Sequence, residues 1–198
     1  MPSSVGHALA GAAAAWCADL VPGDRGWRTA PPRASWYRRA GNGLTLLCAG
    51  VAAAPDLDLL FGSHRMFTHS VGAVLLVGIV AAVVAVRIRR PAIRVALMCA
   101  GAYATHLVLD WLAADSLPPF GLQAFWPFSH AWVISGWDLF RQTERRHFLS
   151  PATIWVNLLS VVQEVAILGP VAVAVWLIRV KALARFSAEM PCSNHAAK

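Results

Sequence analysis

Charged side chains are scarce in this sequence of 198 residues. Asp, Glu, Lys and Arg make up only 14% of the chain, whereas hydrophobic residues make up 58%. Ordinary soluble domains contain about 25% charged and about 45–50% apolar residues. So little charge leaves too little polar surface for a soluble globule, and so many apolar residues exclude a disordered or fibrous chain. The composition therefore predicts an integral membrane protein.

Paired cysteines and nucleic-acid-binding patterns are also missing. The four cysteines have no short paired spacing, and three of them lie in apolar stretches, so neither a zinc ribbon nor a disulfide framework is supported. The net charge is +7, but it comes mostly from short arginine runs beside apolar stretches, without a basic helix carrying interleaved aromatics. We therefore expect no nucleic-acid partner and interpret the arginines as topology signals.

Five apolar segments reach or approach the roughly 17 to 25 residues that a helix needs to cross a bilayer. They are residues 5–21, 44–61, 71–86, 93–114 and 155–178. The sequence therefore predicts an all-α, multi-span membrane bundle of about five helices, with residues 1–186 as a single domain and residues 187–198 as a disordered polar tail. The first segment lacks the basic start of a signal peptide, so we expect it to be retained as a span.

Arginine and lysine residues gather in three places along this predicted bundle. They lie between the first two spans, between spans three and four, and after span five. Because short cytoplasmic loops carry an excess of Lys and Arg, we expect all three on the cytoplasmic side, and the N-terminus and residues 115–154 on the other. The predicted location is the inner membrane, multi-pass and in contact with the lipid bilayer.

Acidic and histidine side chains are concentrated within or beside the predicted spans. A carboxylate near the centre of a span costs about 2.5–3.5 kcal/mol when it has no partner. Four acids are in or at the end of a span, namely Asp56, Asp58, Asp110 and Glu164. On the predicted topology, His7, His64 and His69 lie at the outer ends of their segments. The polar residues therefore converge on the non-cytoplasmic face.

His106 and Asp110 are four residues apart in the fourth span, so they share one helix face with Cβ atoms about 5–6 Å apart. The pair can bind one metal ion, or the carboxylate can orient the imidazole. A His–Asp hydrogen bond between two helices explains the pair equally well. Glu164, nine residues into the fifth span, has two interpretations as well: an intramembrane carboxylate is functional by default, and helix–helix hydrogen bonding is the alternative.

Pro55 predicts a break at the end of the second span, because proline disfavours helix at the preceding residue and suits a first helical turn. Asp56 and Asp58 then lie in the opening turn of a new helix. There they can neutralise the helix dipole, or they can bind a hard cation at the end of the apolar span.

His64 and His69 follow just before the third span. Because they are five residues apart, they face one site only if the chain turns at Ser63 or Arg65. Arg65 itself can clamp an anionic substrate, or its side chain can simply extend to the membrane interface.

The ordered motifs of residues 1–130 resemble those of the YdjM-like family of membrane-bound, metal-dependent hydrolases. These motifs are Gly6-His7, Pro55-Asp56-Leu57-Asp58, His64-Arg65, Thr68-His69-Ser70, His106-x-x-x-Asp110 and Phe125-Trp126-Pro127-Phe128-Ser129. Leu59 and Met66 depart from the family pattern. The family is all-helical, and its motifs are similar to those of zinc-dependent phospholipase C and related nucleases. The resemblance implies a metal site made of His7, Asp56, Asp58, His64, His69, His106 and Asp110.

Residues and resemblance together favour a membrane-embedded, metal-dependent hydrolase that holds one or more divalent ions. Imidazole and carboxylate ligands favour Zn²⁺. Activated water would attack a phosphodiester or phospholipid-like substrate at the membrane face. Asp56 or Glu164 would act as general base, and Arg65 would stabilise charge on a phosphoryl group.

Two other functions deserve comparison with this hypothesis. A lipid phosphate phosphatase that works through a phospho-histidine needs Ser-Arg six residues before His106 and a Lys-x6-Arg-Pro motif, and the sequence has neither. A non-catalytic membrane protein, either a cation transporter or a helix-bundle scaffold, stays open as the alternative. Transporters tend to have broken helices in matching halves at the midplane, whereas these polar residues gather toward one face without a repeat.

Overall fold

The computed structural model describes residues 1–18, 20, 41, 43–61, 65–144, 147 and 149–188. Within them the chain forms five α-helices: α1 (Ser4–Ala18), α3 (Gly43–Ala53), α4 (Val71–Arg87), α5 (Ala92–Leu112) and α6 (Pro151–Ala188). Two 3₁₀ helices, η1 (Ala54–Phe61) and η2 (Phe67–His69), lie between α3 and α4. The described residues contain two isolated β-bridges and no strand. The predicted all-α class is confirmed.

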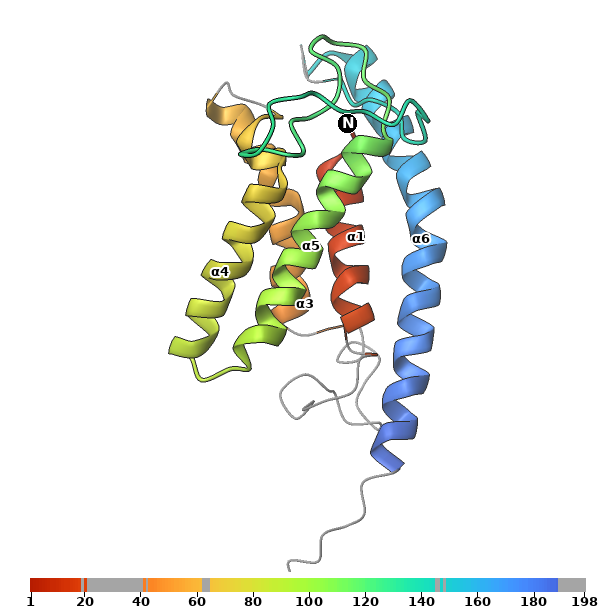
Figure 1. Ribbon diagram of the computed structural model, residues 1–198. Coiled ribbons are helices and arrows are strands. Elements are labelled where there is room, and N and C mark those ends of the chain that lie inside the picture. The colour runs from red at the N-terminus through yellow and green to blue at the C-terminus, as the bar shows by residue number, and fades with distance from the viewer. Residues whose placement is uncertain are drawn as a thin grey trace, which may run out of the picture.

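The helices α1, α3, α4 and α5 lie side by side as a bundle, and α6 runs along α1 (Figure 1). The antiparallel pair of α4 and α5 turns at the lower end of the bundle. Residues 113–144, which we call the cap, fold over the upper end, where η1, η2 and the start of α1 also lie. Segments far apart in the sequence therefore meet beneath the cap.

Proline explains where α3 ends and where α6 begins, whereas the end of α6 lies beyond the predicted span. The second apolar segment changes from α-helix to 3₁₀ helix at Ala54, immediately before Pro55, as the sequence predicts. The last helix has 38 residues and runs from Pro151 to Ala188, beyond both ends of the predicted span and two residues into the predicted tail. Proline suits the first helical position, which explains the start of α6 at Pro151. The basic residues after residue 178 end the apolar stretch, but they do not end the helix.

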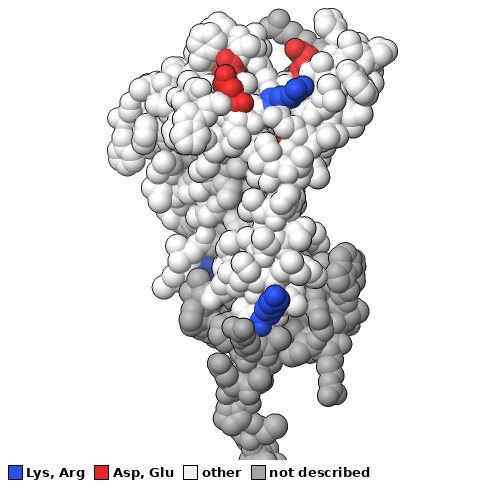
Figure 2. Space-filling model, turned by 90° about the vertical axis from the view of Figure 1, so that its right-hand side faces the viewer, with Lys and Arg blue, Asp and Glu red and all other residues white. Residues whose placement is uncertain are grey.

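Two of the described helices, α5 and α6, are long and apolar enough to cross a membrane. The most apolar stretch of α5 is 44% buried, which makes α5 the central helix, whereas that of α6 is only 11% buried. Exposed side chains on α6 include Trp155, Val162, Val171 and Ile178. Figure 2 shows mostly uncharged surface between the charged side chains near its top and the Lys and Arg side chains lower down. Apolar surface of this extent fits contact with lipid.

Small residues allow α1 and α3 to approach closely. A Cβ atom on Gly11 would lie 2.5 Å from the Cβ of Ala52 and 2.6 Å from the carbonyl oxygen of Cys48. Ala15, one turn further along α1, belongs to the same buried cluster as these two α3 residues. Helices in lipid associate through such small residues, because close backbone approach improves van der Waals packing.

The cap supplies hydrogen bonds to helix ends that would otherwise lack them. Carbonyl groups of Ala124 and Trp126 accept the N–H groups of Val71 and Gly72, at the start of α4, at 2.8 and 3.0 Å. At the end of α5, the Leu112 carbonyl accepts the N–H of a cap residue at 2.8 Å. Terminal N–H and C=O groups have no partner within their own helix. The cap is therefore an integral part of the bundle.

Candidate metal centre

Six ionisable side chains from four helical elements meet beneath the cap, and we call them the His/Asp cluster. They are His7 of α1, Asp56 and Asp58 of η1, His69 of η2, and His106 and Asp110 of α5. All except Asp56 are buried. Burial of so many ionisable groups is costly unless they pair or coordinate a metal ion. The structure brings together six of the seven predicted ligands, and His64 lies outside the described residues.

Local backbone geometry directs these side chains to one place. The α-helix gives way to the 3₁₀ helix η1 beside Pro55, and Arg65 adopts a left-handed conformation with φ +68°. The chain thus turns at Arg65, one of the two positions that the spacing of the histidines required. Ser70 then caps α4 by accepting the N–H of Ala73 at 3.2 Å, which fixes the residue after His69.

Hydrogen bonds at Nδ1 determine which ring nitrogen of two histidines carries the proton when the ring is neutral. The Nδ1 atom of His106 lies 2.7 Å from the Ala52 carbonyl oxygen; a carbonyl only accepts, so Nδ1 carries the proton. The Nδ1 atom of His69 lies 3.2 Å from Oδ2 of Asp58, and burial lowers the pKa of His69. A neutral ring that donates from Nδ1 leaves a lone pair on Nε2. Both Nε2 atoms are therefore available as ligands.

These two nitrogens form a triangle with one carboxylate oxygen. Nε2 of His69 lies 3.0 Å from Nε2 of His106, and Oδ2 of Asp110 lies 3.1 Å from His106 and 3.4 Å from His69. When both rings are neutral, these three lone-pair atoms repel one another unless a cation lies between them. Neighbouring ligands of a tetrahedral Zn²⁺ ion with bonds of about 2.0–2.1 Å are about 3.3–3.4 Å apart. The triangle fits such an ion.

His7 and Asp56 extend the cluster on its other side. The imidazole of His7 stacks on that of His106 with ring centroids 3.7 Å apart, and its Nε2 lies 3.4 Å from Oδ1 of Asp110. Neither ring nitrogen of His7 and neither carboxylate oxygen of Asp110 has a hydrogen-bond partner in the described part of the chain. Asp56 approaches His106 Nε2 to 3.9 Å. Ligand atoms of His7, Asp56 and His106 form a second group that could hold an ion.

Asp58 contacts the back of His69, away from the triangle. Its Oδ2 accepts the backbone N–H of Arg65 at 3.2 Å and the hydroxyl of Thr68, in addition to facing His69 Nδ1. A carboxylate in this position fixes the ring orientation and increases the basicity of the metal-facing nitrogen. These contacts favour an orienting role for Asp58, whereas its direct coordination of a metal stays a prediction.

The Arg65 guanidinium is directed to the cap. It forms an ion pair with Asp115 and lies 3.4 Å from the carbonyl oxygen of Leu117. The same Asp115 carboxylate accepts the N–H of Gly121 at 2.7 Å. Arg65 thus connects the cap, through its side chain, to Asp58, through its backbone. Its predicted contact with an anionic substrate stays a prediction.

Glu164 lies at the contact between α6 and the start of α1. Its Oε1 accepts the backbone N–H of Ser3 at 2.7 Å, and its Oε2 accepts the Ser3 hydroxyl. The side chain is fully buried, and no described contact joins it to the triangle. Its predicted role as general base stays a prediction.

Sequence reasoning missed two partners of the cluster, the Ala52 carbonyl and the Thr68 hydroxyl, and the Asp115 carboxylate that pairs with Arg65. Ala52 carries no side-chain signal. Thr68 stands directly before His69, but threonine beside histidine is not by itself informative. Asp115 is 50 residues from Arg65, and a salt bridge of this separation has no periodicity that could reveal it.

Comparisons with known proteins give one family and no individual relative. No curated protein and no solved structure matches this chain. The family model described as YdjM inner membrane protein matches residues 1–186, which is most of the sequence and covers every residue of the His/Asp cluster. The chain therefore belongs to the YdjM inner membrane protein family.

Proposed function

We propose that this protein is a membrane-embedded hydrolase whose His/Asp cluster binds divalent metal, Zn²⁺, and acts on a phosphodiester or phospholipid-like substrate. The observation that carries the proposal is the triangle of His69 Nε2, His106 Nε2 and Asp110 Oδ2, with edges of 3.0–3.4 Å. Among the described residues, none makes a hydrogen bond to the Asp110 carboxylate. Two imidazoles with one carboxylate favour Zn²⁺ over Mg²⁺ or Ca²⁺. Three protein ligands also leave a position for water, as catalytic sites do.

The roles of the surrounding residues follow from their exposure and contacts. A bound divalent ion supplies Lewis acidity, which makes water more acidic and polarises a phosphoryl oxygen. Asp56 is the cluster carboxylate with partial exposure, so we assign it the proton from the attacking water. We assign Arg65 to the anionic group of the substrate; for this role its guanidinium must exchange the Asp115 carboxylate for substrate oxygens.

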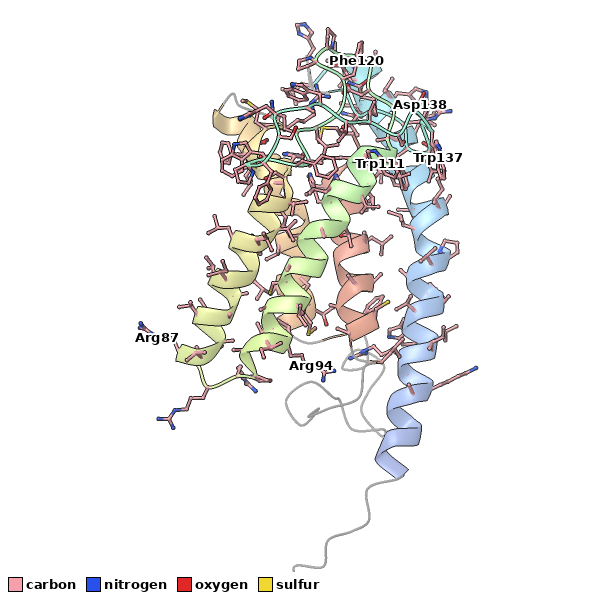
Figure 3. The ribbon with its side chains drawn as sticks, in the orientation of Figure 1. Arg87, Arg94, Trp111, Phe120, Trp137 and Asp138 are labelled. Carbon is pink, nitrogen blue, oxygen red and sulfur yellow. The ribbon has the colours of Figure 1, made fainter. Side chains whose placement is uncertain are left out.

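We further propose that the chain crosses the inner membrane five times, with the cluster at the non-cytoplasmic face. Figure 3 shows Arg87 and Arg94 at the lower end of α4 and α5, and Trp111, Phe120 and Trp137 at the capped end. Arginines favour the cytoplasmic side, and tryptophans favour the membrane interface. The 21 residues of α5 extend about 32 Å, enough to separate these ends by a bilayer.

Metal analysis of detergent-purified protein tests the hydrolase proposal. Wild-type protein and His130→Ala, which alters an exposed histidine of the cap, should retain at least about one Zn²⁺ per chain, whereas His106→Ala should lose it. Hydrolysis of bis(p-nitrophenyl) phosphate and of phospholipid vesicles should stop with a chelator and return with Zn²⁺. Less than about one ion per wild-type chain would overturn the proposal. Bound ion without any hydrolysis would favour a cation transporter or a scaffold.

A further inference from the structure

Glu164 is a fully buried carboxylate on a helix that otherwise faces outward. Only 11% of the most apolar stretch of α6 is buried, yet Glu164 has no exposed surface. No member of the His/Asp cluster comes from α6. A carboxylate is too costly within an apolar span to be retained without a role, and the contacts of Glu164 show which part of the chain it acts on.

Those contacts lie at the first turn of α1. Glu164 accepts both the backbone N–H and the hydroxyl of Ser3. The Ser3 hydroxyl in turn accepts the N–H of Gly6 at 3.3 Å, and the Ser3 carbonyl accepts the N–H of His7 at 3.1 Å. Ser3 therefore caps the helix that carries His7, and Glu164 holds that cap in place.

Gly6 makes this contact possible. A Cβ atom at position 6 would lie 2.5 Å from Oε2 of Glu164, so the carboxylate occupies the space that any other residue would fill. The register between α6 and α1 is thus fixed at the residue immediately before His7.

His7 depends on this register because its own ring is weakly held. Neither ring nitrogen has a hydrogen bond to any residue that the structure describes, and the ring is placed by stacking on His106 and by its approach to Asp110. A rotation or shift of α1 would move His7 away from Asp110 without breaking any hydrogen bond of the imidazole. His69 and His106, in contrast, are each oriented through Nδ1.

We propose that Glu164 is a positioning residue: through Ser3 it fixes the first turn of α1, so that His7 faces Asp110 in the His/Asp cluster. This positioning role replaces the role of general base that the sequence suggested for Glu164. It rests on the proposed function, because it takes the His/Asp cluster to be a metal site. α6 thereby contributes to the site without supplying a ligand.

Co²⁺ titration with visible absorption spectra tests the proposal, because the spectrum reports the ligands of the ion. Glu164→Ala should weaken Co²⁺ binding about tenfold, the lower end of the effect of removing a residue that supports a ligand, and should change the spectrum. Glu164→Gln should bind within about threefold of wild type, because an amide accepts from the Ser3 N–H and donates to the Ser3 hydroxyl.

Gln163→Ala is the matched control. Gln163 accepts the N–H of Arg141 at 3.0 Å and donates to the Leu139 carbonyl at 3.2 Å, so its loss removes two hydrogen bonds between α6 and the cap. A purely structural role for Glu164 would lower the melting temperature of both alanine variants alike and leave Co²⁺ affinity and spectrum unchanged in the folded protein. That result would overturn the proposal.

Labelling at position 7 separates this inference from the proposed function. In a chain with its native cysteines replaced, His7→Cys should react slowly with maleimide, and adding Glu164→Ala should accelerate the reaction. If wild-type protein binds no Co²⁺ but labelling still depends on Glu164, the metal function fails and the positioning role stands. If labelling is equally slow with and without Glu164, the positioning role is wrong.

Discussion

The variant Asp110→Asn should show whether Asp110 is a metal ligand or a residue that only joins helices. The carboxylate of Asp110 lies within 3.1–3.4 Å of imidazole nitrogens of three histidines, more than any other acid of the cluster. Asparagine has nearly the same shape but no charge, and its amide nitrogen cannot coordinate. The variant therefore removes the negative charge from the triangle while preserving the packing around it.

The magnitude follows from the position of Asp110. Loss of a residue that only supports a ligand costs about 10- to 100-fold in metal affinity, so loss of a direct ligand should cost more than about 100-fold, or about 2.7 kcal/mol. Metal-free protein should respond differently. The Asp110 oxygens make no hydrogen bond in the described part of the chain, and burying a carboxylate without hydrogen bonds costs free energy. The melting temperature of the metal-free variant should therefore equal or exceed that of wild type.

The assay is a competitive Zn²⁺ titration with a chromogenic chelator, alongside thermal unfolding of the metal-free protein in detergent. Asp138→Asn is the control, because Asp138 is an exposed cap carboxylate whose φ of +49° asparagine tolerates. Wild-type affinity in Asp110→Asn, or a clear loss of metal-free stability, would refute the reasoning. The pair His106 and Asp110 would then serve to join helices.

Three further predictions test the fold. Arg89→Cys and Phe128→Cys, in a chain without other cysteines, should react with an impermeant maleimide from opposite sides of the inner membrane; reaction from one side contradicts the multi-pass topology. Gly11→Val should lower the melting temperature by several degrees, since its side chain would overlap α3 at a cost of about 1–3 kcal/mol, whereas Gly50→Val, with open space around it, should have a much smaller effect. Ser70→Ala should cost about 1 kcal/mol by removing the N-cap of α4; unchanged denaturant midpoints would show that this cap is dispensable.

The helices could be predicted because their signals are local. Each apolar segment of the sequence overlaps a helix of the structure, although residues 44–61 divide into α3 and η1. That division at Pro55 follows from a steric rule about the preceding residue. The length of α6 could not be predicted in the same way. Basic residues mark where a span leaves the hydrocarbon core, but they do not end a helix, and Pro170 inside α6 is tolerated as prolines in membrane helices are.

The site could be predicted only in part. Spacing placed His106 and Asp110 on one face of α5, and the structure puts Asp110 Oδ2 in the triangle. The division of roles between Asp58 and Asp110 depends on which side of the His69 ring each carboxylate reaches, and sequence spacing carries no such information. Sequence spacing also could not reveal the partner of Glu164, because Ser3 is 161 residues away.

The cluster draws its side chains from opposite ends of the first 110 residues, which has a consequence for biosynthesis. His7 leaves the ribosome 103 residues before Asp110, an interval of about 5–20 s at usual rates of translation. During this time α1 must enter the bilayer, or wait at its surface, with an imidazole that has no partner. The two carboxylates of η1 are also made before α5 and lack their α5 partners until then. The His/Asp cluster can therefore assemble only once α5 has been made, so binding of the proposed metal ion would have to follow synthesis of α1, α3, α4 and α5.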